Sequence, residues 1–421
     1  MTNPSLLDAI RREARDARQS GIVELFNYGR GREGLIPLWV GEGDLPTPAF
    51  IAQAARRSFE AGETFYTAQR GLPALREAIA AYMTRCYGAH GRAFAPDQFF
   101  VTTGGMHALQ IAMRLLAGPG DEVVVPTPAW PNFEAALTIS GARTVGAALE
   151  LSGEGAGLRW RLDPERVARA ITPRTRALVV NSPANPTGWT ASLGELQALL
   201  ALARKHGLWI IADEIYGRIF FEGGRAPSFH DIMEPEDRIL FVQTLSKNWA
   251  MTGWRVGWLE APQALGPVIE NLIQYSTSGV ATPTQRAAAA ALEHGEDFLT
   301  HQLARLRASR DALCAALSAT GKARFALPLG SFYLFCAFEG LTDSRAAAMR
   351  IVDEANVGLA PGTAFGPGGE GFMRICFARD PASIGEAAGR LAGWLRRADV
   401  PSAKMQRAIP EPGLGHGGHE T

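Results

Sequence analysis

One lysine and one arginine in the segment Leu245–Trp258 are well placed to do chemistry. Lys247 follows the apolar run Ile239–Gln243, so we expect its side chain at a strand end, where α/β sheets meet ligands. Burial there lowers the pKa of an amine and makes it a nucleophile that can form a Schiff base. Arg255 offers a planar fork that fits a phosphate. A solvated surface pair is the alternative interpretation, and the segments below decide against it.

Two earlier segments combine a strand end with a phosphate-binding or ring-binding feature. In the first, Gly104 and Gly105 stand between an apolar strand and a helix, where free N–H groups and the helix dipole favour a phosphate. The same pair is also common in ordinary tight turns. In the second, Trp130 lies in a proline-rich loop, where an indole either stacks on a planar ring or fills the core.

Two further segments place polar side chains at strand ends. Asn185 precedes a proline and could donate a hydrogen bond to a ring oxygen, although most Asn-Pro pairs are plain turns. Asp213 follows the buried strand Leu208–Ala212, and a carboxylate under a pyridine nitrogen keeps that nitrogen protonated. A helix cap is the alternative role for Asp213. Tyr216 could bond the same ring oxygen as Asn185. Together with Lys247, these segments supply what a pyridoxal phosphate site requires.

The elements that position these residues form an α/β pattern. After Pro48, continuous apolar runs alternate with helical stretches, which predicts a mainly parallel sheet covered by helices on both faces. The runs expected to be strands are Phe99–Val101, Glu122–Val125, Arg176–Val180, Leu208–Ile211 and Ile239–Val242.

A second, smaller α+β lobe is expected after a long helical stretch at Gln285–Leu317, with strands at Phe332–Phe335 and Phe372–Phe377. The strand-like Ile36–Val40 could join either lobe, and Ser5–Gln19 has the pattern of a short amphipathic helix that packs on a domain or a partner subunit. The predicted division of the chain is an N-terminal arm with part of the small domain (1–45), a large domain (46–300), a small domain (301–400) and a disordered tail (401–421).

The composition excludes several classes of function. The 42 basic and 42 acidic residues leave no net charge, so nothing global favours nucleic acid or an anionic membrane. No apolar run is long enough to span a bilayer. Four scattered cysteines without metal-ligand spacing predict free thiols, no metal site and a cytoplasmic location.

As a set, these motifs resemble the class I/II aminotransferases, the pyridoxal-phosphate-dependent enzymes of fold type I related to aspartate aminotransferase. The resemblance runs from Gly41, in Trp39–Pro48, to Arg374, in Phe372–Ala378. It implies a large domain with a mainly parallel, seven-stranded type of sheet, a smaller α+β domain, and pyridoxal 5′-phosphate as the cofactor. It also implies amino acid and 2-oxo acid substrates and a ping-pong reaction of the EC 2.6.1 type.

The resemblance also implies a role for each matching residue. Lys247 forms the Schiff base and is catalytic together with Asp213 and Tyr216. Asp213 pairs with the ring nitrogen, Asn185 and Tyr216 contact the ring oxygen, and Trp130 stacks on the ring. The phosphate is held by Gly104, Gly105, Met106, Thr244, Ser246 and Arg255. Arg374 grips the substrate α-carboxylate, with Gly41 and Asn185 beside it. Tyr66 reaches the phosphate of a neighbouring subunit, which implies a homodimer with shared active sites.

The reaction and the substrate are less sharply defined by these motifs. A lyase or synthase that eliminates from an amino acid shares the fold and the anchors, and a non-catalytic protein that binds the cofactor or an amino acid is a remote alternative. Some bacterial relatives that use aspartate and prephenate carry a lysine directly after the glycine pair. This chain has Met106 there, which favours a neutral or aromatic substrate side chain over an acidic one.

Overall fold

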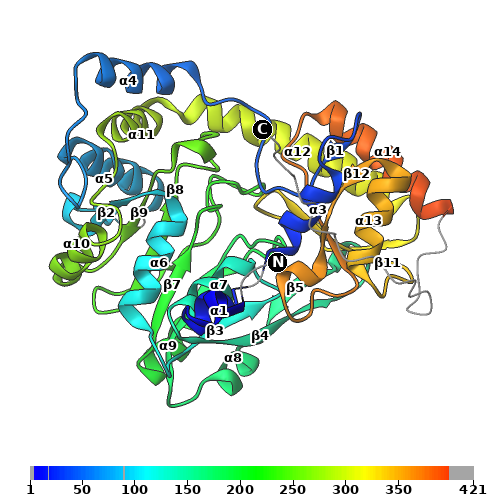
Figure 1. The fold of residues 1–421 in the computed structure, drawn as a ribbon, viewed down its shortest axis with the longest axis horizontal. Coiled ribbons are helices and arrows are strands. Elements are labelled where there is room, and N and C mark those ends of the chain that lie inside the picture. Colours follow the sequence, from blue (N-terminus) through cyan, green and yellow to red (C-terminus); the bar gives the residue numbers. More distant parts are fainter. Residues whose placement is uncertain (1–3, 18, 89–90, 398–421) are drawn as a thin grey trace.

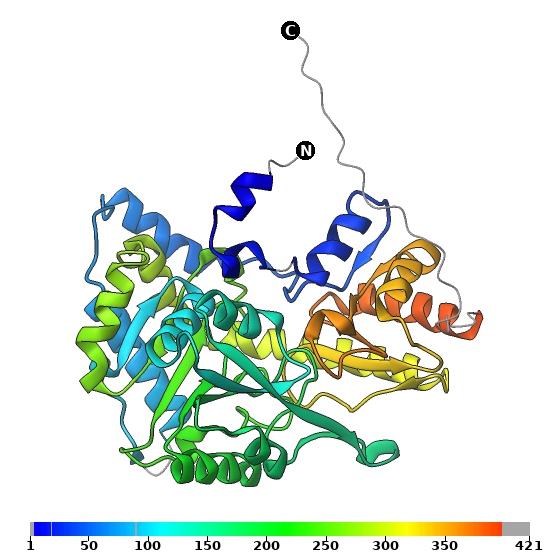
Figure 2. The same cartoon turned by 60° about the horizontal axis from the view of Figure 1, so that its bottom comes forward.

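The computed structural model describes residues 4–17, 19–88 and 91–397. Figures 1 and 2 show two bodies, one containing the large sheet and one built mainly from the C-terminal part of the chain, with α12 running between them. The tail predicted at 401–421 lies outside the described residues. In the described part of the chain, no helix combines the length and the apolar character needed to cross a membrane.

The large sheet has eight strands in the order β2-β9-β8-β7-β6-β3-β4-β5. The pairs among β8, β7, β6, β3 and β4 are parallel, whereas β9 is antiparallel to both of its neighbours and β5 is antiparallel to β4. The predicted mainly parallel sheet is therefore confirmed. The strands are β2 (Phe99–Thr102), β3 (Glu122–Thr127), β4 (Arg143–Ser152), β5 (Arg159–Leu162), β6 (Thr175–Asn181), β7 (Trp209–Asp213), β8 (Ile239–Thr244) and β9 (Gly257–Glu260).

Three strands of this sheet were not predicted from the sequence. β9 follows directly on the Gly/Trp-rich turn that contains Arg255, and it begins with a glycine and ends with a glutamate, so it shows no apolar run. β4 and β5 form an antiparallel extension at the sheet edge. Many positions of β4 are exposed, so it lacks the continuous apolar run that marks the buried strands.

Helices cover both faces of the large sheet (Figure 1). They are α4 (Ala49–Glu60), α5 (Pro73–Tyr87), α6 (Gly104–Leu116), α7 (Pro131–Ile139), α8 (Pro164–Ala170), α9 (Leu193–His206), α10 (Gly266–Gln274) and α11 (Thr282–His294). Short 3-10 helices occur at η2 (Pro96–Gln98), η3 (Gly155–Gly157), η4 (Phe229–Asp231), η5 (Thr252–Trp254), η6 (Gln263–Leu265) and η7 (Gly362–Phe365).

The small sheet is antiparallel and has the order β10-β11-β14-β13. Its strands are β10 (Ala323–Arg324), β11 (Tyr333–Phe338), β13 (Ala360–Pro361) and β14 (Phe372–Cys376), and its helices are α13 (Ser344–Ala355) and α14 (Pro381–Arg397). A separate parallel pair joins β1 (Ile36–Pro37) to β12 (Val357–Gly358). The early segment Ile36–Val40 is therefore tied to the C-terminal part of the chain.

The helical stretch expected at Gln285–Leu317 is two helices, α11 and α12 (Glu296–Ser318). The break falls at Gly295, whose carbonyl accepts a hydrogen bond from Nε1 of Trp249 at 3.2 Å. A Cβ at Gly295 would collide with the indole of Trp249, so the site requires a glycine, and glycine also weakens a helix. The prediction of one continuous helix was wrong for this reason.

The single helix predicted at Ser5–Gln19 was also wrong. The structure has two short helices there, α1 (Pro4–Asp8) and α2 (Arg12–Arg15). Leu6 and Ile10 are exposed, so no apolar face is packed that would hold one longer helix together. The next helix, α3 (Gly21–Gly29), begins where the Ser20 hydroxyl accepts a hydrogen bond from the Ile22 N–H at 3.3 Å.

Candidate active site

A cavity of about 420 Å³ lies where the ends of β6, β7 and β8 meet the segment that follows β1 and the strands β11 and β14. It brings together most of the residues singled out from the sequence, although they come from distant parts of the chain. The predicted residues that line it are Gly41, Gly105, Met106, Trp130, Asn185, Asp213, Tyr216, Thr244, Ser246, Lys247, Arg255 and Arg374. Of the predicted set, Gly104 and Tyr66 are outside this lining.

Lys247 follows the end of β8, as the sequence predicts. Its Nζ donates a hydrogen bond to the carbonyl oxygen of Gly41 at 2.8 Å. Burial lowers the pKa of this amine to about 8, because the charged form loses its hydration. A substantial fraction of Lys247 is therefore neutral near physiological pH, which is the form that attacks a carbonyl carbon.

One end of the cavity has the groups that a phosphate requires. Thr244 and Ser246 place their hydroxyl oxygens 2.9 Å apart, beside the guanidinium of Arg255. Gly104 lies under that guanidinium, and a Cβ at this position would collide with Nη2 of Arg255. Its φ of +77° is a second reason for a glycine at the start of α6. Gly104 therefore shapes this end of the cavity without lining it.

A buried carboxylate stands at another side of the cavity. Asp213 is the last residue of β7 and only 2% exposed. Its Oδ1 accepts a long hydrogen bond from the Ile215 N–H at 3.4 Å, and among the described residues no cation forms an ion pair with it. Burial raises the pKa of Asp213 to about 7. A buried acid of this kind is stabilised when a cationic ring nitrogen of a ligand lies against it.

Two residues that sequence reasoning missed hold the predicted ones in place. Tyr333 of β11 places its hydroxyl 2.8 Å from that of Tyr216. Asn181, at the end of β6, accepts a hydrogen bond from the Asn185 N–H at 2.9 Å and donates one to the Asp213 carbonyl at 3.1 Å. Tyr333 lies in a strand rich in apolar and aromatic residues, so nothing in the sequence marked it as a functional residue. The position of Asn181 at a strand end was such a signal.

Arg374 lies in β14 and is only 2% exposed. Its Nη1 donates to Oδ1 of Asn185 at 3.1 Å, and its Nη2 donates to the carbonyl oxygen of Trp39. Its Nε is buried and has no partner among the described residues. The guanidinium also lies over the ring of Tyr333, 4.6 Å from its centroid. A buried, incompletely paired arginine at the wall of a cavity fits a carboxylate ligand.

The remaining wall of the cavity is uncharged. It includes Ile22 from α3, Val40, Met106, Asn132 from the first turn of α7, Ile215 and Val242. The side-chain nitrogen of Asn132 lies 3.6 Å from the sulfur of Met106. Ile22, Val40, Asn132, Ile215 and Val242 were not predicted, because single apolar residues and a lone asparagine carry no signal in a sequence.

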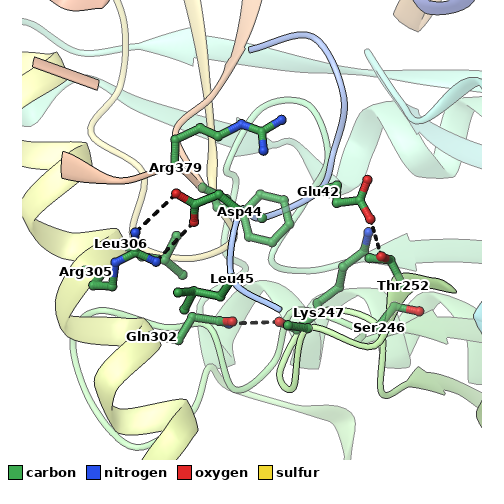
Figure 3. Close-up of a pocket in the computed structure, with 14 residues that line it drawn as sticks. Glu42, Asp44, Leu45, Ser246, Lys247, Thr252, Gln302, Arg305, Leu306 and Arg379 are labelled. Carbon is green, nitrogen blue, oxygen red and sulfur yellow. Dashed lines mark hydrogen bonds and ion pairs between the residues drawn. The ribbon is translucent and has the colours of Figure 1, made fainter. Parts of the chain in front are cut away.

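A second, smaller cavity of about 50 Å³ also borders Lys247 and is drawn in Figure 3. Thr252 donates a hydrogen bond to Glu42 on one side of it. On the other side Arg305 of α12 bonds both carboxylate oxygens of Asp44, at 3.1 and 3.2 Å. The backbone carbonyl of Lys247 accepts a hydrogen bond from Gln302 at 2.8 Å. The hydrogen bond from Gln302 holds the segment of Lys247 against α12, and Arg305 holds the segment of Asp44 against the same helix.

The outlying residue is Tyr66, whose side chain is 94% exposed. It does not line the cavity of its own chain. The predicted contact of Tyr66 with a neighbouring subunit therefore stays a prediction.

Comparison with known proteins agrees with this geometry. The family described as aminotransferase class I and II matches residues 33–391. The aspartate/prephenate aminotransferase of Thermus thermophilus is 33% identical over 94% of this chain and 97% of its own length. The arginine–pyruvate transaminase of Pseudomonas aeruginosa is 36% identical over 86% of this chain and 90% of its own.

A solved structure gives the same result. The alanine aminotransferase of Pyrococcus furiosus superposes with a TM-score of 0.86 and 26% identity, covering 92% of this chain and all of that one. The chain belongs to the class I and II aminotransferases. It is an aminotransferase of fold type I that uses pyridoxal 5′-phosphate, and amino acids and 2-oxo acids are its substrates. The names of these relatives cover acidic, basic and small amino acids, so the comparisons leave the preferred side chain open.

Proposed function

We propose that this aminotransferase prefers amino acids with neutral or aromatic side chains over acidic ones. The observation that carries the proposal is the uncharged wall formed by Ile22, Val40, Met106 and Asn132. The three cations among the described lining residues are Lys247, Arg255 and Arg374, and each has a separate task in the proposed site. No lining cation of this chain is then left for a second carboxylate, and burying an unpaired charge is costly.

The roles of the cofactor-binding residues are part of this proposal. The pairing of Thr244 with Ser246 and the position of Arg255 over Gly104 support a phosphate site there. The buried Asp213 supports a partner for the ring nitrogen, and Tyr216 supports a contact to the ring oxygen. Asn185 would share that oxygen, Trp130 would cover the ring, and the backbone of Gly105 and Met106 would bind the phosphate.

Pyridoxal 5′-phosphate, when bound, supplies a carbonyl group and an electron-accepting ring. Residues of the protein bind and orient the substrate and transfer the proton. Arg374 binds the substrate α-carboxylate through its fork and, with Gly41 and Asn185 beside it, orients the Cα–H bond. Lys247 would take the proton from Cα and return it to the bound cofactor, and the depressed pKa of its amine suits both transfers. Asp213 would hold a negative charge against the ring nitrogen. Two such half-reactions in turn give ping-pong kinetics.

The substrate preference is tested by the half-reaction alone. Purified enzyme is mixed with single amino acids, without any oxo acid, and the bleaching of the cofactor absorbance is timed. Leucine, methionine and phenylalanine are expected to react at least about tenfold faster than aspartate and glutamate. A side-chain carboxylate without a cation partner raises the free energy of the bound substrate by about 1.4 kcal/mol or more, which corresponds to this factor. Met106→Lys should raise the rate with aspartate, while Met106→Leu serves as its uncharged control. A wild-type preference for aspartate would overturn the proposal.

The active unit is proposed to be a homodimer in which Tyr66 completes the neighbouring site. Phe65, Tyr66 and Tyr275 are large aromatic side chains that are 84–94% exposed in the single chain. Their segments lie together, because Gln69 donates a hydrogen bond to Gln274 at 2.5 Å. Exposed aromatic surface of this kind supports an interface with a second copy.

The division into domains and the location of the protein also remain proposals. The large sheet uses residues 99–260 and the small sheet residues 323–376, which supports a large domain at 46–300 and a small domain at 301–400. The proposed boundary falls inside α12, which would link the two. All four cysteines carry free thiols, which supports a cytoplasmic, reducing location.

A further inference from the structure

Four buried polar side chains lie outside the active site and take no part in the chemistry above. They are Glu214, Ser228, His230 and Glu260, and each is at most 5% exposed. Glu214 follows the last residue of β7, Ser228 caps η4, His230 lies in η4, and Glu260 ends β9. Buried titratable groups are costly unless they are paired, so their arrangement calls for a physical explanation.

The four side chains form one continuous chain of hydrogen bonds. The Ser228 hydroxyl oxygen lies 2.7 and 2.8 Å from the two carboxylate oxygens of Glu214 and 3.0 Å from Nδ1 of His230. Nε2 of His230 lies 3.0 Å from the carboxylate of Glu260. The imidazole is stacked on Phe241 with 3.7 Å between centroids, so its orientation is fixed.

Two distributions of protons satisfy this chain equally well. In the first, His230 is an imidazolium that donates to Glu260 and to Ser228, while Ser228 donates to an ionised Glu214. In the second, Glu214 carries a proton and donates to Ser228, Ser228 donates to Nδ1, and a neutral His230 donates to Glu260. Both distributions carry one net negative charge. In the second distribution, that charge lies on Glu260 instead of being shared with Glu214.

Asp213 directly precedes Glu214, the first member of this hydrogen-bonded set, in the sequence. Successive residues at a strand end point to opposite sides, so Asp213 lines the cavity while Glu214 faces Ser228. Burial raises the pKa of Glu214 to about 7, as it does for Asp213. The charge of Glu214 further raises the pKa of Asp213, and the charge of Glu260 further raises that of Glu214.

The other groups that face these hydrogen-bonded side chains include some that favour ionised carboxylates and some that do not. The Phe229 N–H donates to Glu214 at 3.3 Å and favours its ionised form. Arg225 contributes positive charge but is engaged by Asp231 at 2.9 Å. Tyr87 packs beside the imidazole with 5.3 Å between centroids, and burial raises the pKa of its phenol.

We propose that Glu214, Ser228, His230 and Glu260 form a proton relay. The relay removes the negative charge of Glu214 when the adjacent Asp213 is ionised. When Asp213 is ionised under a cationic ring nitrogen, the proton of His230 Nδ1 moves to Ser228 Oγ as the Ser228 proton moves to Glu214. One N–H and one O–H bond break, two O–H bonds form, and no electrons or co-reactants are needed. Glu214 becomes neutral beside the charged Asp213. The relay residues are positioning residues, and the inference rests on the role proposed for Asp213.

The test is infrared and ¹⁵N NMR spectroscopy of the enzyme with its cofactor at pH 7. The infrared spectrum is expected to contain a carboxylic-acid C=O band that is lost in Glu214→Gln and kept in Glu222→Gln, an exposed control. The NMR signals of His230, assigned by their loss in His230→Gln, should be those of a neutral ring protonated at Nε2. Asp213→Asn should return the proton to His230 and abolish the band.

Two results would overturn the relay. One is an acid band that survives in Glu214→Gln, and the other is an imidazolium at His230 in the wild-type enzyme. The NMR measurement needs no variant of Glu214, so a Glu214→Gln protein that fails to fold does not remove the test. Failure of the role proposed for Asp213 is recognised separately, because the cofactor absorbance would then be the same in the wild type and in Asp213→Asn.

Discussion

At the scale of single residues, the reactive amine is Lys247. Its pKa of about 8 makes about one-tenth of the amines neutral at pH 7 and about half at pH 8. Schiff-base formation by the cofactor-free protein should therefore speed up roughly fivefold between these pH values and level off above pH 9. Stopped-flow absorbance after addition of pyridoxal phosphate measures this rate. A rate that keeps rising to pH 10.5 would mean that burial does not depress the pKa.

A second residue-scale prediction concerns Arg374. Arg374→Lys keeps the charge but removes the fork that faces the cavity beside Asn185. The rate constant kcat/KM for an amino acid should fall roughly tenfold to a hundredfold, because a bidentate contact becomes a single one. The half-reaction with a simple amine that lacks a carboxylate is the control and should change little. An equal loss with both substrates would assign Arg374 a purely structural role.

Sequence reasoning worked well at this scale where a residue type is needed by the chemistry. Lys247 and Asp213 were found because an amine and a carboxylate stand at strand ends, whereas Arg374 was assigned through the resemblance to the aminotransferases. Ile22, Val40 and Asn132 escaped because their value lies in shape and lack of charge. Only the folded chain brings such residues to one wall.

At the scale of secondary-structure elements, the turn from β2 into α6 is the most constrained feature of the phosphate end. Gly104→Ala would place a Cβ against Arg255 at a φ of +77°. We expect a loss of about 1–3 kcal/mol, measured as weaker cofactor binding in a fluorescence titration. Gly118→Ala is the matched control, since a Cβ there meets no atom within 4 Å. Equal cofactor affinity in both variants would show that Arg255 can move aside freely.

The elements themselves were predicted where the apolar pattern is long and continuous. β3 and β8 are buried throughout, β6 and β7 are buried at all but one position each, and all four were recognised as strands from the sequence. The helix break at Gly295 was missed because it depends on Trp249, which is distant in the sequence. The N-terminal helix was overestimated because spacing alone does not provide a partner for Leu6 or Ile10.

At the scale of the whole molecule, the prediction concerns shared active sites. Tyr66→Ala removes a side chain that is 94% exposed in its own chain, and Lys247→Ala removes the reactive amine. Each variant alone should be nearly inactive. Tyr66→Ala loses a contact with the cofactor phosphate, and Lys247→Ala loses the amine that forms the Schiff base. Mixed after unfolding and refolding together, they should recover about a quarter of wild-type activity, since half of the random dimers hold one intact site.

Refolded mixtures of Lys247→Ala with wild-type enzyme provide the control for this complementation. No recovery in the mixed variants, with a dimeric mass in solution, would mean that Tyr66 serves only the interface. A monomeric mass for an active enzyme would contradict the shared site altogether.

The most direct test of the account is the visible absorption of the purified enzyme during two separate half-reactions. A neutral amino acid alone should bleach the yellow Schiff-base band completely, and a 2-oxo acid added afterwards should restore it. Lys247→Ala should show neither a native band nor catalytic cycling. A band that stays yellow while ammonia or a keto acid accumulates would contradict transamination at this site, and a wild-type protein that stays colourless with added pyridoxal phosphate would contradict the site itself.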